Sequence, residues 1–332
     1  MKIININNQS AQPKYKQIVL SVEIAIAEKR LKRDEKLPSV NKVSLEFSIS
    51  RDTVLLAYDE LKKRGIIYAV LGKGYYVKSV EFTLEQRIFL LFDELNAFKE
   101  DLYTSFLYHV NKNFQIDIFF HHFNLEMFNK LVNESKGNYS KYIIMPSNLE
   151  IPTEVIKVLP LNDTYVLDQT NETLSQFPTV YQDFVGDMYD ALMFGLEKIK
   201  KYEELILIFP GNKEPVGMVS GFLKFCSENN CKHAVVSTFE KDEIKKGSLF
   251  IIPSDRHLVN VIEQAKFQNL TLGIDYGIIS YNDTSLKKVV ENGITTISTD
   301  FNEMGKILAE MINTNLNSNI KNNSKLILRN SI

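Results

Sequence analysis

Arg51 and Thr53 stand at the start of a segment in which apolar residues recur at helical spacing. An arginine side chain can donate two parallel hydrogen bonds to guanine, and the methyl group of a threonine can contact the methyl group of thymine. Lys73 lies between Gly72 and Gly74 in a second segment, where its charge could meet a phosphate group. These residue types are typical of a surface that reads double-stranded DNA.

Two helices and a hairpin are predicted to position these side chains. Ser39 and Ser50 each precede an amphipathic run, where a serine hydroxyl can accept from the free N–H groups of a first helical turn. Gly65 suits the left-handed residue that ends a helix. The apolar runs on either side of Lys73 predict a hairpin with the lysine at its tip. This order is that of a winged helix-turn-helix, whose second helix enters the major groove with its first turn.

A helix pair followed by a hairpin also occurs in small domains that do not bind DNA. The order of the elements alone therefore does not indicate DNA binding, and individual motifs have to do so. They are Pro13-Lys14-Tyr15-Lys16-Gln17-Ile18, Leu37-Pro38-Ser39, Ser50-Arg51, Thr53-Val54, Ala57-Tyr58, Leu61, Gly65 and Gly72-Lys73-Gly74-Tyr75. Together they resemble the winged-helix domain of the GntR family of bacterial transcription regulators. The resemblance implies contacts to operator DNA from Ser39, Asn41, Ser50, Arg51, Thr53, Lys73 and Gly74. Asn41 stands where the family usually has arginine, and asparagine suits adenine better than guanine.

Charge is distributed unevenly along the chain. Residues 1–80 contain 15 Lys+Arg and 8 Asp+Glu, a net charge of +7, whereas the remaining residues carry −9. A basic module joined to an acidic one is typical of a DNA reader attached to a domain that does not bind DNA. We therefore predict a DNA-binding domain at residues 1–79, beginning with a loose polar arm, a linker at 80–84 and a second domain at 85–332.

Length and composition exclude several classes of protein. The 332 residues suffice for two or three domains, and 44% hydrophobic and 24% charged residues are ordinary for a soluble protein. Neither a signal peptide nor a run of ~20 apolar residues is present, so we expect a cytoplasmic protein with no membrane partner. Cys226 and Cys231 have neither metal-ligand nor disulfide spacing.

After Leu84, apolar strand-like runs alternate with amphipathic segments. The predicted strands are Arg87–Phe92, Gln115–Phe120, Lys141–Met145, Thr164–Leu167, Leu205–Phe209, His233–Val236, Leu249–Ile252, Gly277–Tyr281, Thr295–Ser298 and Lys325–Leu328. The predicted helices include Leu102–Val110, Glu126–Ser135, Asp183–Lys201, Met218–Asn229, Leu258–Gln268 and Glu303–Ile312, and Asn313–Ser324 is expected to be a surface connection. This alternation predicts an α/β fold with doubly wound parallel sheets, long enough for two lobes.

A second resemblance covers this region. Its clearest motifs are Ile278-Ile279-Ser280-Tyr281-Asn282-Asp283-Thr284, Gly293-Ile294-Thr295-Thr296-Ile297 and Phe301-Asn302-Glu303-Met304-Gly305. They are similar to the effector domain of LacI-type repressors and to ribose-type periplasmic binding proteins. The resemblance implies two lobes joined by three crossovers, a small ligand in the cleft between them, and a homodimer. The layout of the whole chain is similar to that of the arabinose repressors.

Ligands of open α/β sheets lie beyond the carboxyl ends of the strands. Taken residue by residue, the resemblance and the neighbouring side chains predict ligand contacts from Asp93, Phe98, Lys99, Asp168, Met218, Ser254, Arg256, Asn282 and Thr299. By the resemblance, Met218 and Asn282 stand where the family has charged groups that grip vicinal sugar hydroxyls, and Ser254 stands where it has an asparagine. These replacements favour a sugar with an apolar edge, such as a pentose or 6-deoxyhexose. Phe98 could instead belong to the core, and Arg256 could cap a helix or form a salt bridge.

His121 and His122 follow a predicted strand, and neither a carboxylate nor a cysteine stands near them at metal-ligand spacing. We expect ordinary strand-end histidines there and no metal. No Ser/His/Asp order and no phosphate-binding Gly-Lys-Ser/Thr motif is present, so neither an enzyme nor a cofactor is predicted. A catalytic rear domain, as in GntR chimeras with an aminotransferase-like domain, would need a Schiff-base lysine and a phosphate loop, and neither is found.

The sequence thus predicts a dimeric transcription regulator, a repressor of carbohydrate-use genes, whose affinity for a pseudo-palindromic operator changes when a small ligand closes the lobes. Arg51 and Thr53 would read bases, while Ser39, Ser50 and Lys73 would contact the DNA backbone. Two alternatives stay open. The ligand could be a metabolite other than a sugar, or the cleft could be vestigial and the domain only dimerise.

Overall fold

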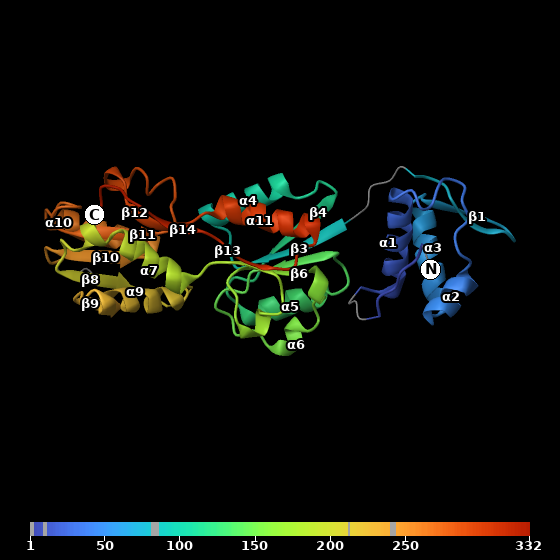
Figure 1. Cartoon of the computed structure of the whole chain (residues 1–332), viewed down its shortest axis with the longest axis horizontal. Helices are drawn as coiled ribbons and strands as arrows, with labels where there is room; N and C mark the ends of the chain where they lie inside the picture. Colours follow the sequence, from blue (N-terminus) through green and yellow to red (C-terminus); the bar gives the residue numbers. More distant parts are fainter. Residues whose placement is uncertain (1–2, 9–11, 81–85, 212, 240–243) are drawn as a thin grey trace.

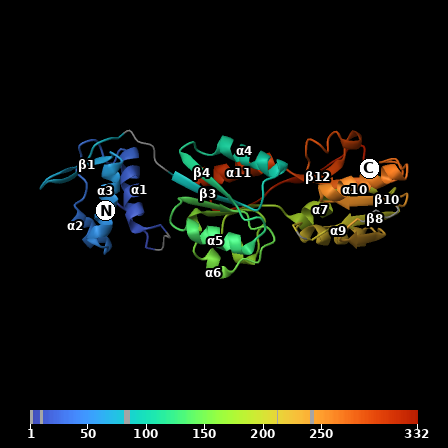
Figure 2. The same ribbon diagram turned by 180° about the vertical axis from the view of Figure 1, so that it is seen from behind.

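The chain folds into three units that lie in a row, with the N-terminal helices at one end and the C-terminus in the unit at the other (Figures 1 and 2). The computed structural model describes residues 3–8, 12–80, 86–211, 213–239 and 244–332. Of the predicted linker 80–84, residues 81–84 lie outside this described part. None of the described helices is long and apolar enough to cross a membrane.

The first unit is a winged helix-turn-helix. It contains α1 (Lys14–Ala27), α2 (Val40–Phe47), α3 (Arg51–Lys63), β1 (Ile67–Val70) and β2 (Gly74–Val77). The hydroxyls of Ser39 and Ser50 accept hydrogen bonds from the backbone N–H groups of Lys42 and Thr53, so both predicted helix starts are confirmed. Gly65 follows α3 with φ +73°, a conformation that favours glycine.

Residues 3–8 pack against α1 and do not form the loose arm predicted for the start of the chain. Ile4 is 1% exposed and belongs to the core of the winged helix. The hydroxyl of Ser21 donates to the carbonyl of Asn5 at 3.0 Å, and the N–H of Asn7 donates to Gln17 Oε1 at 2.8 Å. The loose arm was predicted because asparagines dominate the composition of this stretch. Burial of Ile4 in the core instead fixes the stretch against α1.

The middle unit, the N-terminal lobe, is a six-stranded parallel sheet with helices on both faces. Its strands are β3 (Gln86–Phe92), β4 (Phe114–Phe120), β5 (Lys141–Ile144), β6 (Thr164–Asp168), β7 (Thr179–Tyr181) and β13 (Asn319–Lys321), and its helices are α4 (Ala97–His109), α5 (Leu125–Ser135), α6 (Thr153–Ile156), α11 (Phe301–Thr314), η1 (Leu161–Asp163) and η2 (Glu172–Leu174). The order of the strands is β13-β7-β6-β5-β3-β4. Helices α4 and α11 cover one face and α5 and α6 the other (Figure 1).

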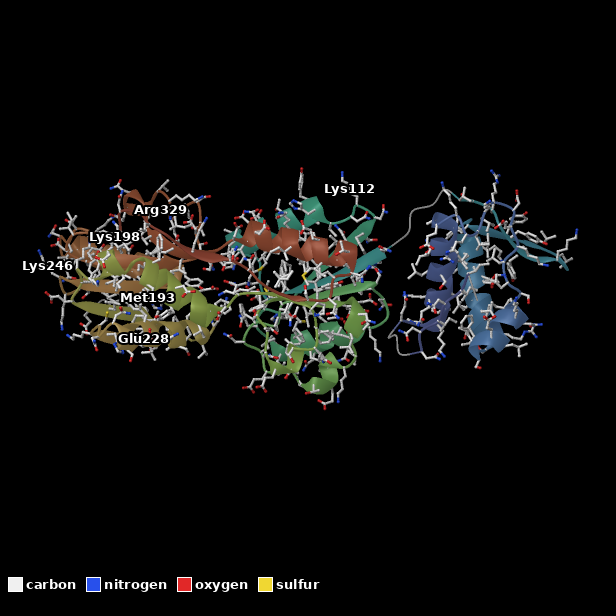
Figure 3. All side chains as sticks on the ribbon, viewed as in Figure 1. Lys112, Met193, Lys198, Glu228, Lys246 and Arg329 are labelled. Carbon is white, nitrogen blue, oxygen red and sulfur yellow. The ribbon has the colours of Figure 1, made fainter. Side chains whose placement is uncertain are left out.

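The last unit, the C-terminal lobe, repeats this architecture. Its strands are β8 (Glu204–Ile208), β9 (His233–Val236), β10 (Ser248–Ile252), β11 (Gly277–Tyr281), β12 (Thr295–Thr299) and β14 (Ser324–Ile327), and its helices are α7 (Phe184–Phe194), α8 (Leu196–Ile199), α9 (Gly217–Glu228), α10 (Asp255–Phe267) and η3 (Val290–Asn292). The order is β14-β12-β11-β10-β8-β9, with β14 antiparallel to β12. Helices α7 and α9 lie side by side, where the Tyr189 hydroxyl donates to Glu228 at 2.5 Å; Figure 3 labels Met193 and Glu228 on this surface.

The chain crosses between the lobes three times, as the resemblance implied. The crossings connect β7 to α7, β12 to α11, and β13 to β14. Arg329, just after the last crossing, forms an ion pair with Asp283 and fixes the C-terminal segment to its lobe (Figure 3). Two close helix contacts depend on glycine: a Cβ at Gly305 would lie 2.3 Å from the carbonyl oxygen of Leu102, and one at Gly221 would lie 2.4 Å from that of Val185.

Most predicted elements are present, but four details differ. Strands β7 and β13 were not predicted, because three residues carry too little periodicity. Helix α4 begins at Ala97 rather than near Leu102, because Asn96 accepts a hydrogen bond from the N–H of Lys99 and caps it. The long predicted helix 183–201 is divided at Gly195 into α7 and α8.

Candidate DNA-binding surface and ligand cleft

The predicted base-reading residues lie at the exposed start of α3. Arg51 is exposed, whereas Thr53 is partly buried and its hydroxyl lies 2.8 Å from that of Ser50. Asn41 is exposed in the first turn of α2. In Figure 1, α1 stands between α3 and the N-terminal lobe, so the neighbouring lobe does not cover α2 or the wing. The surface that these residues form is therefore open to a ligand as large as a DNA duplex.

The wing places Lys73 at its exposed tip. Gly72 and Gly74 on either side have φ +73° and +113°, as the predicted turn requires. The wing is fixed to the helices by Tyr58, which packs edge-on against Tyr75 with ring centroids 4.8 Å apart. The Tyr58 hydroxyl also donates to the carbonyl of Pro38 at 2.7 Å, and burial raises its pKa. One buried tyrosine therefore positions the wing and the start of α2 relative to α3.

A cavity of about 320 Å³ lies between the two lobes, beyond the carboxyl ends of their strands. Six of the predicted ligand contacts line it: Asp93, Phe98, Lys99, Asp168, Met218 and Asn282. Phe98 also packs against Phe301 with ring centroids 4.8 Å apart, so it belongs both to the cleft wall and to the edge of the core. Residues that sequence reasoning did not single out complete the lining, among them Gln182, Tyr281, Lys213 and Lys287.

Three predicted ligand contacts do not line this cavity. Ser254 lies in extended backbone before α10, and its neighbours Pro253 and Asp255 face the cavity in its place. Arg256 is exposed on the first turn of α10. Thr299 is buried, and its hydroxyl donates to Gln182 where two of the crossovers meet. Spacing along the chain placed them near strand ends, but the direction of each side chain was set by the helix or strand that carries it.

His121 is a buried strand-end histidine, as expected. One ring nitrogen hydrogen-bonds to the carbonyl of Met145 at 2.9 Å, and burial lowers the pKa of the ring. Among the residues that the structure describes, no group of three or more His, Cys, Asp or Glu side chains is arranged to hold a metal ion.

The floor of the cleft contains a buried ion pair. Asp93 and Lys99 are 3% and 5% exposed and pair with each other. The Ser147 hydroxyl donates to the second oxygen of Asp93 at 2.5 Å. Near this pair, Asp168 ends β6 with φ +76° and accepts a hydrogen bond from the Gln182 side chain. Burial raises the pKa of Asp168, although the nearby charge of Lys99 opposes this. A positive φ is a strained backbone conformation for an aspartate, and residues with such strain are often found at binding sites.

Contacts also connect the lobes across the mouth of the cleft. Lys213, in the loop after β8, forms a 2.5 Å ion pair with Glu94 and lies 4.7 Å from the ring centroid of Phe123. The side-chain amide of Asn148 donates to the carbonyls of Lys213 and Glu214 at 3.2 and 3.0 Å. These contacts join the two lobes at the mouth of the cleft.

The crossovers contain a second buried carboxylate. Asp187, in the first turn of α7, is 5% exposed and pairs at 3.2 Å with Lys321 from β13, which also contacts Asp183. Burial raises the pKa of Asp187 to about 6, although Lys321 opposes this. The first and third crossovers are thus connected by one lysine and two carboxylates.

This shift predicts how stability depends on pH. Because the pKa of Asp187 is higher in the folded than in the unfolded chain, its contribution is largest below pH ~4 and decreases as pH rises towards about 6. In Asp187→Asn this decrease should be absent, so the variant should gain stability relative to the parent between pH 4 and 6.5. Urea unfolding of both proteins across that range measures the difference. A constant difference over the whole range would contradict the raised pKa.

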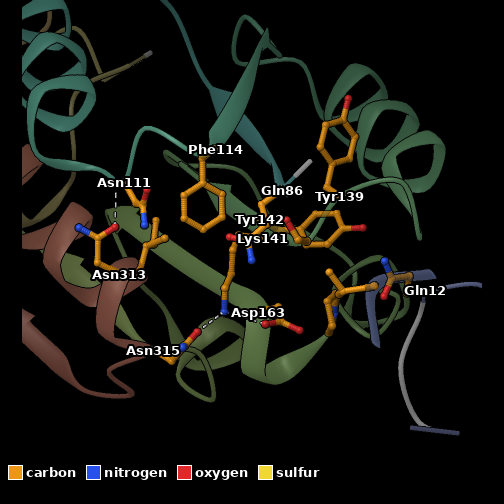
Figure 4. Close-up of a pocket in the computed structure, with 14 residues that line it drawn as sticks. Gln12, Gln86, Asn111, Phe114, Tyr139, Lys141, Tyr142, Asp163, Asn313 and Asn315 are labelled. Carbon is orange, nitrogen blue, oxygen red and sulfur yellow. Dashed lines mark hydrogen bonds and ion pairs between the residues drawn. The ribbon is translucent and has the colours of Figure 1, made fainter. Parts of the chain in front are cut away.

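A second pocket, of about 330 Å³, lies between α1 and the N-terminal lobe (Figure 4). Its most prominent charged group is Lys141, whose ammonium donates to Asp163 at 2.7 Å and to Asn315 at 2.6 Å. The backbone N–H of Asn111 donates to Asn313 Oδ1 at 2.9 Å. Because these polar groups satisfy each other, the pocket offers a ligand fewer partners than the cleft does.

Known proteins match both parts of the chain. Residues 14–77 match the model of bacterial regulatory proteins of the gntR family, and residues 200–331 match the periplasmic binding protein-like domain. The chain joins a GntR-family helix-turn-helix domain to a periplasmic-binding-protein-like domain. Helices α2 and α3 and the wing lie within the first matched region, and most of the C-terminal lobe lies within the second.

Individual relatives match either most of the chain or one part of it. The arabinose metabolism transcriptional repressor of Geobacillus stearothermophilus is 22% identical over 90% of both chains. The transcriptional repressor NagR of Bacillus subtilis is 34% identical over 99 residues, which cover 30% of this chain and only 38% of NagR. Among solved structures, the trehalose repressor of Escherichia coli superposes with a TM-score of 0.62 at 13% identity, over 74% of this chain and 100% of that one. The last match establishes the fold of the two lobes.

Proposed function

We propose that this protein is a transcriptional repressor of carbohydrate-use genes, and that a sugar bound between its lobes controls its affinity for operator DNA. The observation that carries the proposal is the presence, in one chain, of an exposed α3 start with Arg51 and an interlobe cavity lined by Phe98, Asp168 and Asn282. The relatives named above are transcriptional regulators, and two are named for arabinose and trehalose. Such a repressor acts in the cytoplasm, where its operator lies.

On the DNA side, two copies of the chain would bind a pseudo-palindromic operator. Arg51 and Thr53 would meet base edges in the major groove, and Asn41 would add a contact that suits adenine. Ser39 and Ser50 would hold the starts of α2 and α3 against the DNA backbone, an expectation supported by their position at the two helix starts. Lys73 and Gly74 would bring the wing to a neighbouring phosphate.

A direct contact offers a route from the cleft to the DNA. Lys16 on α1 donates to Asn138 Oδ1 at 3.1 Å and to the carbonyl of Gly137 at 3.5 Å, both in the N-terminal lobe. These residues lie between α5 and β5, and β5 runs from there towards the cleft, where the loop after it carries Asn148. Ligand binding that moves the lobes would thereby change the position of α1. A coupling free energy of about 1–3 kcal/mol is ordinary for such a change.

For the effector we propose a pentose or a 6-deoxyhexose. Met218 is 4% exposed and lines the cavity beside Phe184 and Pro215, so this part of the wall is apolar. An unsubstituted sugar edge or a methyl group would lie against it at little cost in desolvation.

The test is a thermal unfolding series followed by an operator-release assay. A ligand of the folded cleft must raise the melting temperature by mass action, by an amount that grows with its concentration. We expect one sugar from a panel of pentoses, 6-deoxyhexoses and hexoses to do so, and the same sugar to change the affinity of the chain for an operator selected from random DNA. A neutral pentose or 6-deoxyhexose as effector is ruled out if no member of the panel raises the melting temperature, and the sugar effector as a class is ruled out if charged sugars also fail to do so.

Two alternatives stay open. If the domain only dimerises, the contacts of Lys213 with Glu94 and Phe123 would serve to hold the two lobes together. In that case no small molecule would change DNA affinity, although the dimer would still bind operator. A non-sugar metabolite as effector would instead give a response to a compound outside the sugar panel.

Lys73 should contribute to DNA affinity without reading sequence. Because it would meet a phosphate, Lys73→Ala should weaken binding of all sequences about equally and reduce the slope of log affinity against log salt by about one. Lys112→Ala is the matched control, since Lys112 is also exposed but lies on the N-terminal lobe (Figure 3). Equal salt slopes for the two variants would place the wing away from the DNA.

A further inference from the structure

The three lysines that line the cleft are each paired with a carboxylate, which leaves two carboxylates of the described lining, Asp168 and Glu214, without an ion pair. Each lysine in the cavity lining has a carboxylate partner there: Lys99 pairs with Asp93, Lys213 with Glu94 at 2.5 Å, and Lys287 with Asp255 at 2.8 Å. Lys287 also donates to the carbonyls of Tyr281 and Asn282. No lysine of the described lining is therefore left for an anionic ligand.

Asp168 is the buried one of these two carboxylates, whereas Glu214 is partly exposed. Asp168 is 6% exposed, lines the cavity, and has no ion-pair partner among the residues that the structure describes. Lys99, the cation that acts on it most, is already held by Asp93. The contact made by Asp168 to a side chain is with Gln182, a neutral amide. A buried carboxylate without its own cation is unfavourable, and a positive charge brought beside it would relieve this.

Two further groups in the lining lack partners. The Tyr281 hydroxyl and Asn282 Oδ1 are buried and have no hydrogen-bond partner among the described residues, although both residues line the cavity. Buried polar atoms of this kind are normally satisfied, so they mark places where a ligand would hydrogen-bond. Asn282 offers an acceptor, and the tyrosine hydroxyl offers a donor and an acceptor. A ligand that satisfies all three residues needs several donors.

We infer that the cleft binds a sugar that carries a protonated amine, with the ammonium group against Asp168 and hydroxyl groups towards Tyr281 and Asn282. The inference rests on the proposed function and specifies the ligand class of the same site. An ammonium donates to Asp168 through charge-assisted hydrogen bonds, which a neutral hydroxyl cannot match. A carboxylate or phosphate on the ligand would instead meet Asp168 with like charge, since the three lysines are already paired.

Matched sugars test this inference on the full chain. D-glucosamine, D-glucose and D-glucuronate form one set, and D-galactosamine, D-galactose and D-galacturonate a second, beside the neutral pentoses and 6-deoxyhexoses of the first panel. Melting temperatures over a concentration series give an apparent affinity for each compound. We expect at least one amino sugar to bind about tenfold or more tightly than its neutral parent, and the uronates to bind worst.

The variant Asp168→Asn separates charge from shape, because asparagine has nearly the same volume and no charge. It should lose the preference for the amine and bind the amino sugar and its parent about equally. Glu214→Gln is the control, since Glu214 also lines the cavity but is partly exposed. That variant should keep the preference. Far-ultraviolet circular dichroism confirms that both variants are folded.

The outcomes are distinguishable. Binding of a neutral sugar or a uronate that equals or exceeds binding of the amino sugars overturns the inference and leaves the proposed sugar effector in place. A preference for the amine that persists in Asp168→Asn also overturns it. If no sugar of any charge raises the melting temperature, the inference and the proposed effector both fail.

Discussion

Replacing Lys99 by methionine should lower the free energy of unfolding by about 3–5 kcal/mol, the cost of removing one partner of a buried ion pair. Methionine keeps most of the packing volume but leaves Asp93, which is 3% exposed, without its cation. Asp168 also loses the positive charge that opposes the rise of its pKa. Two buried carboxylates would then face the cleft without compensation. Urea unfolding at pH 7 measures the change.

The same variant should recover stability in acid. Protonation removes the uncompensated charges, so the difference between parent and variant should shrink as pH falls below about 5. Lys213→Met is the matched control, because Lys213 also pairs with a cleft carboxylate but its side chain is 54% exposed. Exposed pairs contribute about 0–1 kcal/mol. Equal losses in the two variants would mean that burial does not determine the contribution of the Lys99 pair.

Arg51→Ala should weaken operator binding by about 1–3 kcal/mol, which is roughly fivefold to 150-fold, and relax specificity at one base pair. The side chain is exposed at the start of α3, so its removal should leave the stability of the domain nearly unchanged. Binding to an operator selected by the parent protein, and to versions with single base changes, measures both effects.

Lys62→Ala controls for loss of a positive charge from the same helix. Lys62 lies in the last turn of α3 and pairs with Asp59 at 2.7 Å, at the opposite end from Arg51. We expect it to change affinity equally for all sequences, and by less. If Arg51→Ala binds the operator as tightly as the parent, the start of α3 does not enter the major groove.

The contacts between the lobes limit how a ligand can enter the cleft. Lys213, Glu94 and Asn148 join the lobes across the mouth, so a ligand must bind by opening these contacts or by adding to them. In the first case the exposed ion pair would slow entry and Glu94→Gln would speed it. In either case, the side chains at the floor of the cleft determine which ligand is bound. These are Asp93, Lys99 and Asp168.

Local features of the fold could be predicted from the sequence. The helix starts at Ser39 and Ser50 and the glycine turns around Lys73 depend on residues within a few positions of each other, and the structure contains them. The apolar runs of the two sheets carry the same kind of local signal. Where the signal was short or weak, as in β7 and β13 or the first turn of α4, the prediction missed the element.

By itself, the sequence determined the order of the winged-helix elements and the alternation of strands and helices in an α/β fold, because these follow from local periodicity and capping. The two lobes and the cleft between them were implied by the resemblance of the motifs to LacI-type effector domains. Only the tertiary structure decided which side chains meet. It buried Ile4, turned Ser254 and Arg256 away from the cavity, and paired Lys99 with Asp93 while leaving Asp168 without a cation. These outcomes depend on contacts between segments that are distant in the sequence. The packing of those segments determines the direction of each side chain and which carboxylate pairs with Lys99.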